Sequence, residues 1–169
     1  MSTSSAFVHP RWGLQFHWWA VDPSGQVGLF HSAFGPVPVA AHTHVAAIDG
    51  ATAQARASHP EWFDWICHDD PEDCPQTHCP VTLDRGPYLF TWDEETDDRY
   101  TRFGVPKRPL LAAEMPRRLA DAALLIETDF TFERTVRIDL SHPAGRELLS
   151  GSDTHRHGNT EPADDVRSS

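Results

Sequence analysis

Alternating and aromatic-rich runs along the chain predict two β-hairpins. The first run, residues 15–21, meets a second run, residues 26–32, across the sequence DPSG at 22–25. Asp before Pro, with Gly closing the turn, is typical of a type I turn between paired strands. Because both faces of the run at 15–21 carry a tryptophan, we expect this hairpin to be covered on two sides or to line an interface.

The pattern between residues 43 and 105 predicts a helix followed by the second hairpin. The Ala-rich stretch 43–58 favours a helix that ends before Pro60. Three prolines indicate an irregular loop over 67–86. A strand near 88–92, an acidic turn and a returning strand near 100–105 then form the hairpin.

The last third of the chain predicts one more helix and one more strand. The helix is expected over 114–127 and the strand over 128–140, where apolar residues alternate. The order of elements predicts an α+β fold, with an antiparallel sheet built from two β-hairpins and a late strand and packed with one or two helices. We expect a single domain over 1–144 and a disordered polar C-terminal tail over 145–169.

Size and composition fit one domain with its own hydrophobic core. The 169 residues are 39% hydrophobic and include six Trp and nine Phe, which bury large areas. No run approaches the roughly 18 to 20 apolar residues that span a bilayer, and the N-terminus lacks a secretory signal pattern. Three cysteines make no paired disulfide framework. We therefore expect a cytoplasmic protein with reduced thiols and no membrane partner.

The net charge of −11 lies in one segment of the chain. Positive and negative side chains balance before residue 61 and after residue 98, whereas the segment between holds Arg85 alone against twelve acids. Such a field repels phosphate backbones, which argues against nucleic acid, and attracts basic protein surfaces. The twelve acids are Glu61, Asp64, Asp69, Asp70, Glu72, Asp73, Asp84, Asp93, Glu94, Glu95, Asp97 and Asp98.

All three cysteines fall within CHDDPEDCPQTHCP at 67–80, which makes this segment a candidate metal site. Cys74 and Cys79 are four residues apart, at the edge of the spacing of zinc ligand pairs, and Cys67 with His68 completes a candidate set. The intervening carboxylates disfavour a reactive thiolate. An acidic loop with ordinary thiols is the preferred interpretation, and a zinc site stays the alternative.

A second metal-like pattern is His42-Thr43-His44, with Asp49 one turn further on. Metal-dependent hydrolases use such a pair after a strand, together with ligands from elsewhere. A helix over 43–58 separates side chains two positions apart, which argues against the pair. Phosphate-binding glycine loops, nucleophile elbows and HExxH motifs are missing, so the sequence favours a protein without catalytic residues.

Two segments carry a resemblance to a known group of proteins. WWAVDPSGQVGLFHSAFGPVP and YLFTWDEETDDRYTRFGVPKRPL resemble parts of small bacterial proteins, some of which are similar to immunity proteins that neutralise a polymorphic toxin. The likeness covers about 15–38 and 87–116 and brings no catalytic residue with it. It implies a protein partner, and the composition resembles that of an actinomycete.

These observations lead to the hypothesis of a non-enzymatic protein-binding module. Its acidic surface at 61–98 engages a basic partner, of which a nuclease-type toxin is one form, and it needs no cofactor. The first alternative is a zinc-binding protein, with a structural Cys/His site or a metal-dependent hydrolase site. The second is a scaffold module without a ligand. The expected contact residues are Asp69, Asp70, Glu72, Asp73, Asp93, Glu94, Glu95, Asp97 and Asp98.

Metal analysis separates the first two hypotheses. We expect untagged protein to carry no stoichiometric metal when native elemental mass spectrometry is applied. One zinc per chain, together with lower stability in chelator, would instead assign the cysteine cluster as a structural site.

Overall fold

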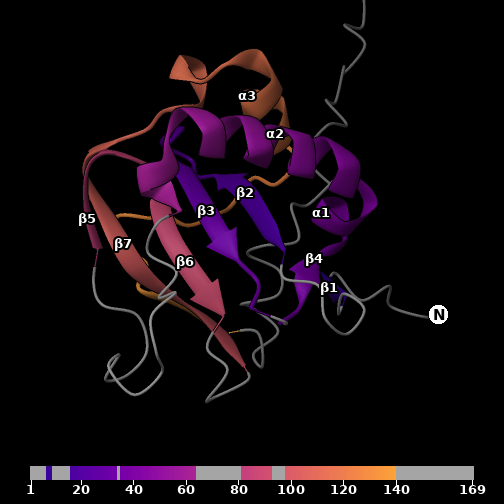
Figure 1. The fold of residues 1–169 in the computed structure, drawn as a ribbon. Coiled ribbons are helices and arrows are strands. Elements are labelled where there is room, and N and C mark those ends of the chain that lie inside the picture. The colour runs from indigo at the N-terminus through magenta and orange to yellow at the C-terminus, as the bar shows by residue number, and fades with distance from the viewer. Residues whose placement is uncertain (1–6, 9–15, 34, 64–80, 93–97, 140–169) are drawn as a thin grey trace, which may run out of the picture.

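The computed structural model describes residues 7–8, 16–33, 35–63, 81–92 and 98–139. Among them a six-stranded mixed sheet is covered on one face by helices (Figure 1). The strands are β1 (Phe7–Val8), β2 (His17–Val21), β3 (Val27–His31), β4 (Val37–Pro38), β5 (Val81–Gly86), β6 (Tyr88–Trp92), β7 (Arg99–Pro109) and β8 (Arg137–Asp139). The helices are α1 (Val39–Thr43), α2 (Val45–Ser58) and α3 (Arg117–Ala123), with 3-10 turns η1 (Pro60–Trp62) and η2 (Ala112–Glu114).

The first hairpin is confirmed. β2 and β3 pair antiparallel across the predicted turn, in which the Gly25 N–H donates to the Asp22 carbonyl at 2.9 Å. Gly25 has a φ of 77°, a conformation that glycine adopts without strain. The buried Asp22 carboxylate accepts hydrogen bonds from the N–H groups of Ser24 and Gln26, so one side chain holds the whole turn.

The second hairpin, β6 with β7, is also confirmed, but the sheet is not purely antiparallel. β3 pairs in parallel with β6 and β5 in parallel with β7, giving the order β2-β3-β6-β7-β5, with β8 on β7. The helices between the two hairpins carry the chain back across one face of the sheet, which is the connection that the parallel neighbours β3 and β6 need, whereas β5 and β7 are connected through β6. The α+β class therefore holds, with two parallel pairings that the sequence pattern did not predict.

Three boundaries differ from those expected. Residues 81–86, predicted as part of a loop, form β5, because their partners at 104–109 are distant in the sequence. The helix expected over 114–127 is limited to α3, and η2 ends just before it, at the approach to Pro116. The strand expected over 128–140 is limited to β8, because most of that segment folds in turns over the sheet.

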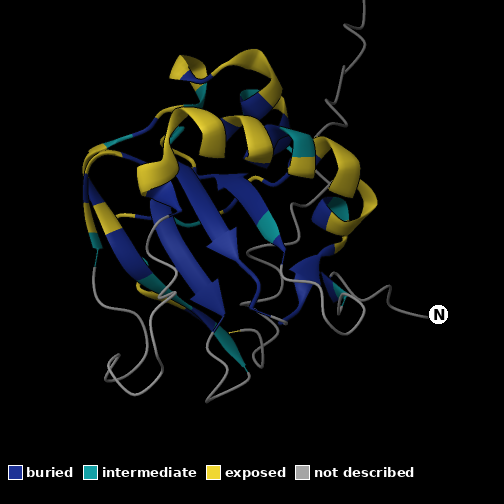
Figure 2. Ribbon diagram, in the orientation of Figure 1, coloured by how far each residue is buried: buried dark blue, intermediate teal, exposed yellow. Residues whose placement is uncertain are grey.

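Aromatic side chains fill the sheet face that is turned away from the helices, and the strands that carry them are buried (Figure 2). Trp18 stacks on Phe30 with ring centroids 3.9 Å apart, and Phe30 stacks on Phe90 at 4.6 Å, so the three rings follow the cross-strand register of β2, β3 and β6. Phe132 covers this stack from the segment after α3. Its N–H donates to the Asp22 carboxylate at 3.0 Å, which joins the first turn to the last part of the fold.

The opposite face of the sheet lies under α2 and α3. Trp19 is fully buried there, and its indole N–H donates to the Thr52 hydroxyl of α2 at 3.0 Å. The outward side of α2 is largely exposed, as the yellow ribbon in Figure 2 shows. The hairpin is thus buried on both faces, as the two adjacent tryptophans predicted.

Two further predictions concern the extent of the chain. Within the described ranges no helix is long and apolar enough to cross a membrane. The tail predicted over 145–169 lies outside the described residues, as does the end of the domain predicted over 1–144.

Loss of the Tyr100 hydroxyl is expected to destabilise the fold. This fully buried group accepts from the Trp18 indole at 3.2 Å and donates to the Pro36 carbonyl at 2.7 Å. Tyr100→Phe leaves both partners buried without a hydrogen bond, so the free energy of unfolding, measured in urea, should fall by about 1–3 kcal/mol. Val105→Ala, at an exposed position of the same strand, is the control and should change it by less than about 0.5 kcal/mol. Equal stability of both variants would refute this role of the hydroxyl.

Candidate functional site

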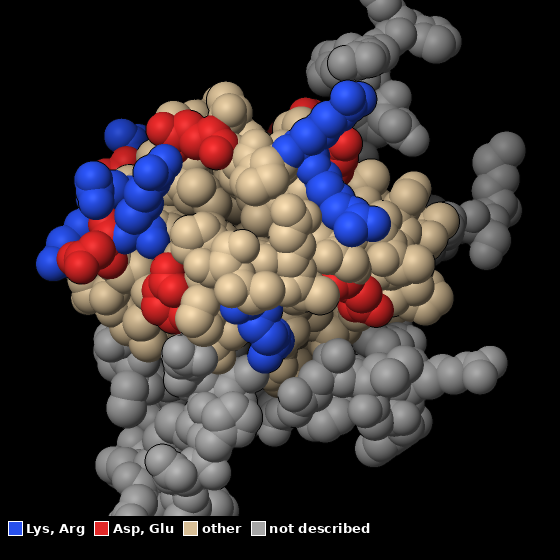
Figure 3. Space-filling model, turned by 45° about the horizontal axis from the view of Figure 1, so that its top comes forward, with Lys and Arg blue, Asp and Glu red and all other residues tan. Residues whose placement is uncertain are grey.

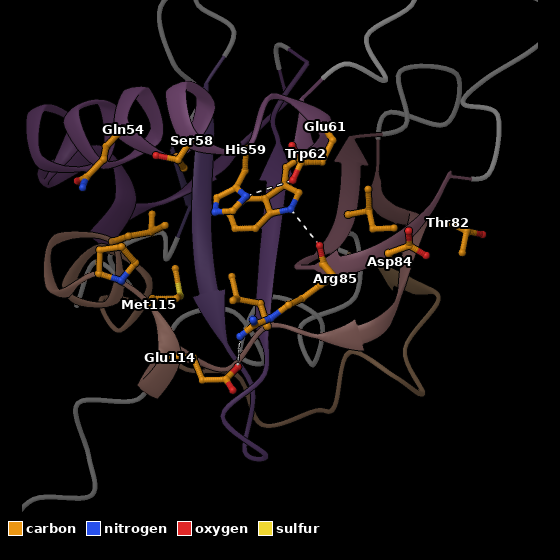
Figure 4. A pocket seen from close by; sticks show the side chains of 15 residues that line it. Gln54, Ser58, His59, Glu61, Trp62, Thr82, Asp84, Arg85, Glu114 and Met115 are labelled. Carbon is orange, nitrogen blue, oxygen red and sulfur yellow. Dashed lines mark hydrogen bonds and ion pairs between the residues drawn. The ribbon is translucent and has the colours of Figure 1, made fainter.

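A pocket of about 590 Å³ opens between the end of α2, η1, β5 and the η2–α3 segment (Figure 4). This volume falls in the range of roughly 300–1,000 Å³ that is usual for ligand pockets. Its floor is apolar and its rim is charged, which is the arrangement that holds an amphipathic group. The apolar side chains are Ala55, Trp62, Leu83, Leu110, Met115, Pro116 and Leu119; the ionisable ones are His59, Glu61, Asp84, Arg85 and Glu114.

Trp62 fixes the position of η1 against β5. The side chain is almost fully buried, and its indole N–H donates to the Arg85 carbonyl at 3.2 Å. The His59 ring stacks on it with centroids 4.1 Å apart and planes 10° from parallel. A Cβ at Gly86 would lie 2.8 Å from the indole nitrogen, so only glycine permits this close approach of strand and ring. Figure 4 shows the indole directed at the strand across the pocket.

The charged side chains of the rim form ion pairs on exposed surface. The Arg85 guanidinium forms an ion pair with the Glu114 carboxylate at 3.1 Å, and the His59 ring nitrogen Nδ1 lies 3.1 Å from the Glu61 carboxylate. The Lys107 ammonium hydrogen-bonds Asp84 at 2.8 Å and lowers the pKa of that carboxyl. Exposed pairs of this kind contribute little to stability, with a median of about 0–1 kcal/mol, so a ligand can exchange with either member at low cost.

Carboxylates outnumber cations in the pocket. Glu61, Asp84 and Glu114 lie with two cations, the Arg85 guanidinium that pairs with Glu114 and the Lys107 ammonium that pairs with Asp84, so the group has a net charge of −1 with His59 counted as neutral. On the face shown in Figure 3, Lys and Arg side chains lie beside Asp and Glu side chains, in keeping with these ion pairs. The excess of carboxylates favours a cationic ligand group.

The pocket does not form a nucleophile–base pair from its described residues. Ser58 lines it next to His59, and the ring of His59 contacts Glu61, so the three residue types of a hydrolytic triad are present. Among the hydrogen bonds of the described residues, however, none joins the Ser58 hydroxyl to His59. Acyl transfer needs that contact to activate the hydroxyl, so Ser58, His59 and Glu61 do not form a catalytic triad in the described structure.

Most of the predicted contact residues lie outside the described ranges. Asp98 is described: its carboxylate pairs with Arg99 at 2.6 Å, just before β7 begins. Asp98 does not line the pocket. The pocket adjoins β5, which pairs with residues 104–109 at the other end of β7. Outside the description are Asp69, Asp70, Glu72, Asp73, Asp93, Glu94, Glu95 and Asp97.

The zinc set Cys67, His68, Cys74 and Cys79 also lies outside the described residues. The second pattern is described: His42 and His44 are exposed at the junction of α1 and α2, and the His44 ring bonds the Ala40 carbonyl at 2.9 Å. Within the described part of the chain, no three His, Cys, Asp or Glu side chains gather as a metal site. His42, His44 and Asp49 therefore do not come together as metal ligands in the described structure.

No protein-family model, curated protein sequence or solved structure matches the chain, so no family is assigned.

A second hollow, beside α2, is lined in part by the half-buried His17, which lies next to the buried His31. His17 and His31 face each other across β2 and β3 with ring centroids 4.8 Å apart, and Phe63 closes over His17 edge-on at 5.6 Å. Burial lowers the pKa of His17 to about 3, with smaller contributions from His31 and the Arg56 guanidinium. The fold therefore holds His17 as a neutral ring.

This burial predicts that acid weakens the fold. The unfolded chain takes up a proton on His17 below its ordinary pKa of 6.5, whereas the folded chain does so only near pH 3. Stability is thus full above about pH 7 and falls as the pH drops from 6.5, by up to about 1.4 kcal/mol per unit. Urea unfolding at pH 7.5, 6.0 and 5.0 should show a shallower loss in His17→Leu than in the parent. His42→Gln, at an exposed site, is the control, and equal slopes in all three proteins would contradict the prediction.

Proposed function

We propose that this protein is a non-enzymatic binding module that engages a basic protein partner. The observation that carries the proposal is the pocket beside Trp62, with an apolar floor and a surplus of carboxylates at its rim. A lysine or arginine side chain has the matching chemistry, because its aliphatic stem covers apolar surface while its charged head meets carboxylates.

The acidic segment supports the same class of partner. Glu61 and Asp84 belong both to the rim and to the segment 61–98 that holds the excess negative charge. A concentrated field of one sign raises the rate at which an oppositely charged protein associates, and short-range contacts then set the lifetime of the complex. The pocket provides such contacts, since its floor excludes water from part of the interface.

A nuclease-type toxin is the form of basic partner that we favour. Proteins that bind nucleic acid carry Lys and Arg surfaces for the phosphate backbone, and an acidic module meets these surfaces directly. The resemblance of 15–38 and 87–116 to immunity-like proteins suggests the same pairing, with the cytoplasm as the compartment. The zinc alternative has no supporting observation among the described residues and stays a prediction.

Charge reversal at the rim tests the proposal. The full chain is used to select from a random dodecapeptide display library, and the selected peptides are synthesised and measured by surface plasmon resonance. We expect them to be basic. Reversal of Glu61, Asp84 and Glu114 to Lys should reduce the affinity at least about tenfold, slow association and flatten its dependence on salt.

The matched control reverses Asp121, Glu127 and Asp129, which are exposed and lie outside the pocket. Both triple variants change the net charge by the same amount, so a general loss of attraction affects them equally. Neutral or acidic selected peptides, or equal weakening by the two variants, would refute the pocket as the binding site.

A further inference from the structure

β5 is the last strand of the described sheet, and its side away from β7 adjoins the pocket. Among the described residues it pairs with β7 alone. The Gly86 carbonyl accepts from the Leu110 N–H at 2.8 Å, so Gly86 directs its backbone groups toward β7 and its continuation. The Arg85 carbonyl instead accepts from the Trp62 indole, so Arg85 directs its groups away from β7.

Alternate residues of a strand direct their N–H and C=O groups to opposite sides, which identifies the open set on β5. Leu83 lies two residues before Arg85 and therefore shares its outward direction. In the described part of the chain, no hydrogen bond is formed by the outward N–H and C=O of Leu83 or by the N–H of Arg85. These groups form a short template for another strand.

The pocket runs along this open side. Four consecutive residues of β5, 82–85, line it, although their side chains alternate between the two faces of the sheet. A hollow lined by four consecutive residues of one strand extends along that strand. Beyond the edge lies the apolar floor, and at its rim stand Glu61, Asp84 and Glu114.

We infer that the partner binds through an extended basic segment that adds as a strand to β5 and places one side chain in the pocket. This inference rests on the proposed function and names its mode of recognition. In such complexes main-chain hydrogen bonds supply affinity and side-chain pockets supply specificity. The excess of carboxylates around the pocket selects a segment in which Lys or Arg alternates with apolar residues.

The probe is the acetylated and amidated peptide KVRLRVK, which presents one basic and one apolar face when extended. Binding to the full chain is measured by fluorescence anisotropy at low salt. Two analogues carry N-methyl groups on one or the other alternate set of amides, which removes donors but keeps every charge and side chain. Strand addition predicts a loss of at least about tenfold for one analogue and less than about threefold for the other.

Amide hydrogen exchange gives a second, site-specific measurement. On peptide binding the Leu83 and Arg85 amides should exchange at least about tenfold more slowly, because they become donors to the added strand. The Thr101 amide, in the part of β7 that pairs with β8, is the control and should not change.

The outcomes separate the inference from the proposed function. If both analogues bind like the parent peptide while reversal of the three rim carboxylates weakens all of them, strand addition is overturned and the basic-partner proposal stands. Absence of binding by KVRLRVK up to millimolar concentration also overturns strand addition, and the charges on β5 then serve to protect the edge. If selection yields no basic peptides, both fail. Concentration-dependent protection of Leu83 in protein alone, with a dimer in sedimentation, assigns the edge to a second copy and overturns the inference.

Discussion

The stacking of Trp18, Phe30 and Phe90 across three neighbouring strands is the contact on which the rest of the structure depends. It joins the two hairpins through the parallel pairing of β3 and β6, which lies at the centre of the sheet. Tyr100 meets Trp18 and Phe30 edge-on, so β7 is tied to the same group. β5 pairs with β7 and lines the pocket. The aromatic contacts that fix β7 therefore also fix the position of the pocket, although the pocket lies on the helical side of the sheet.

The two hairpins follow from sequence-local signals, and the pocket does not. The DPSG turn, the aromatic alternation of β2 and the Ala-rich α2 each depend on residues close together in the chain, and the structure has all three. β5 depends on partners about twenty residues later, and its charged residues break the alternation that marks a strand, so the local pattern predicts a loop there.

The pocket residues come from five elements, α2, η1, β5, η2 and α3, and no local pattern marks them as one site. Glu61 and Asp84 enter the sequence hypothesis through their charge, whereas His59 and Glu114 have no pattern to mark them. Their proximity is a property of the folded chain. The acidic residues that the sequence favours as contacts and the cysteine cluster fall mainly outside the described part of the structure.

The hydrogen bond from the Phe132 N–H to Asp22 has a consequence for the order of folding. It spans 110 positions, so it closes a loop of nearly the whole domain, and closure of long loops is entropically costly and slow. On the ribosome the first hairpin emerges early, with its turn already held by local bonds from Ser24 and Gln26. One aromatic face of that hairpin then stays exposed to solvent until the segment that contains Phe132 has been synthesised. Until then the nascent chain exposes Trp18 and Phe30, which are part of the core of the folded protein.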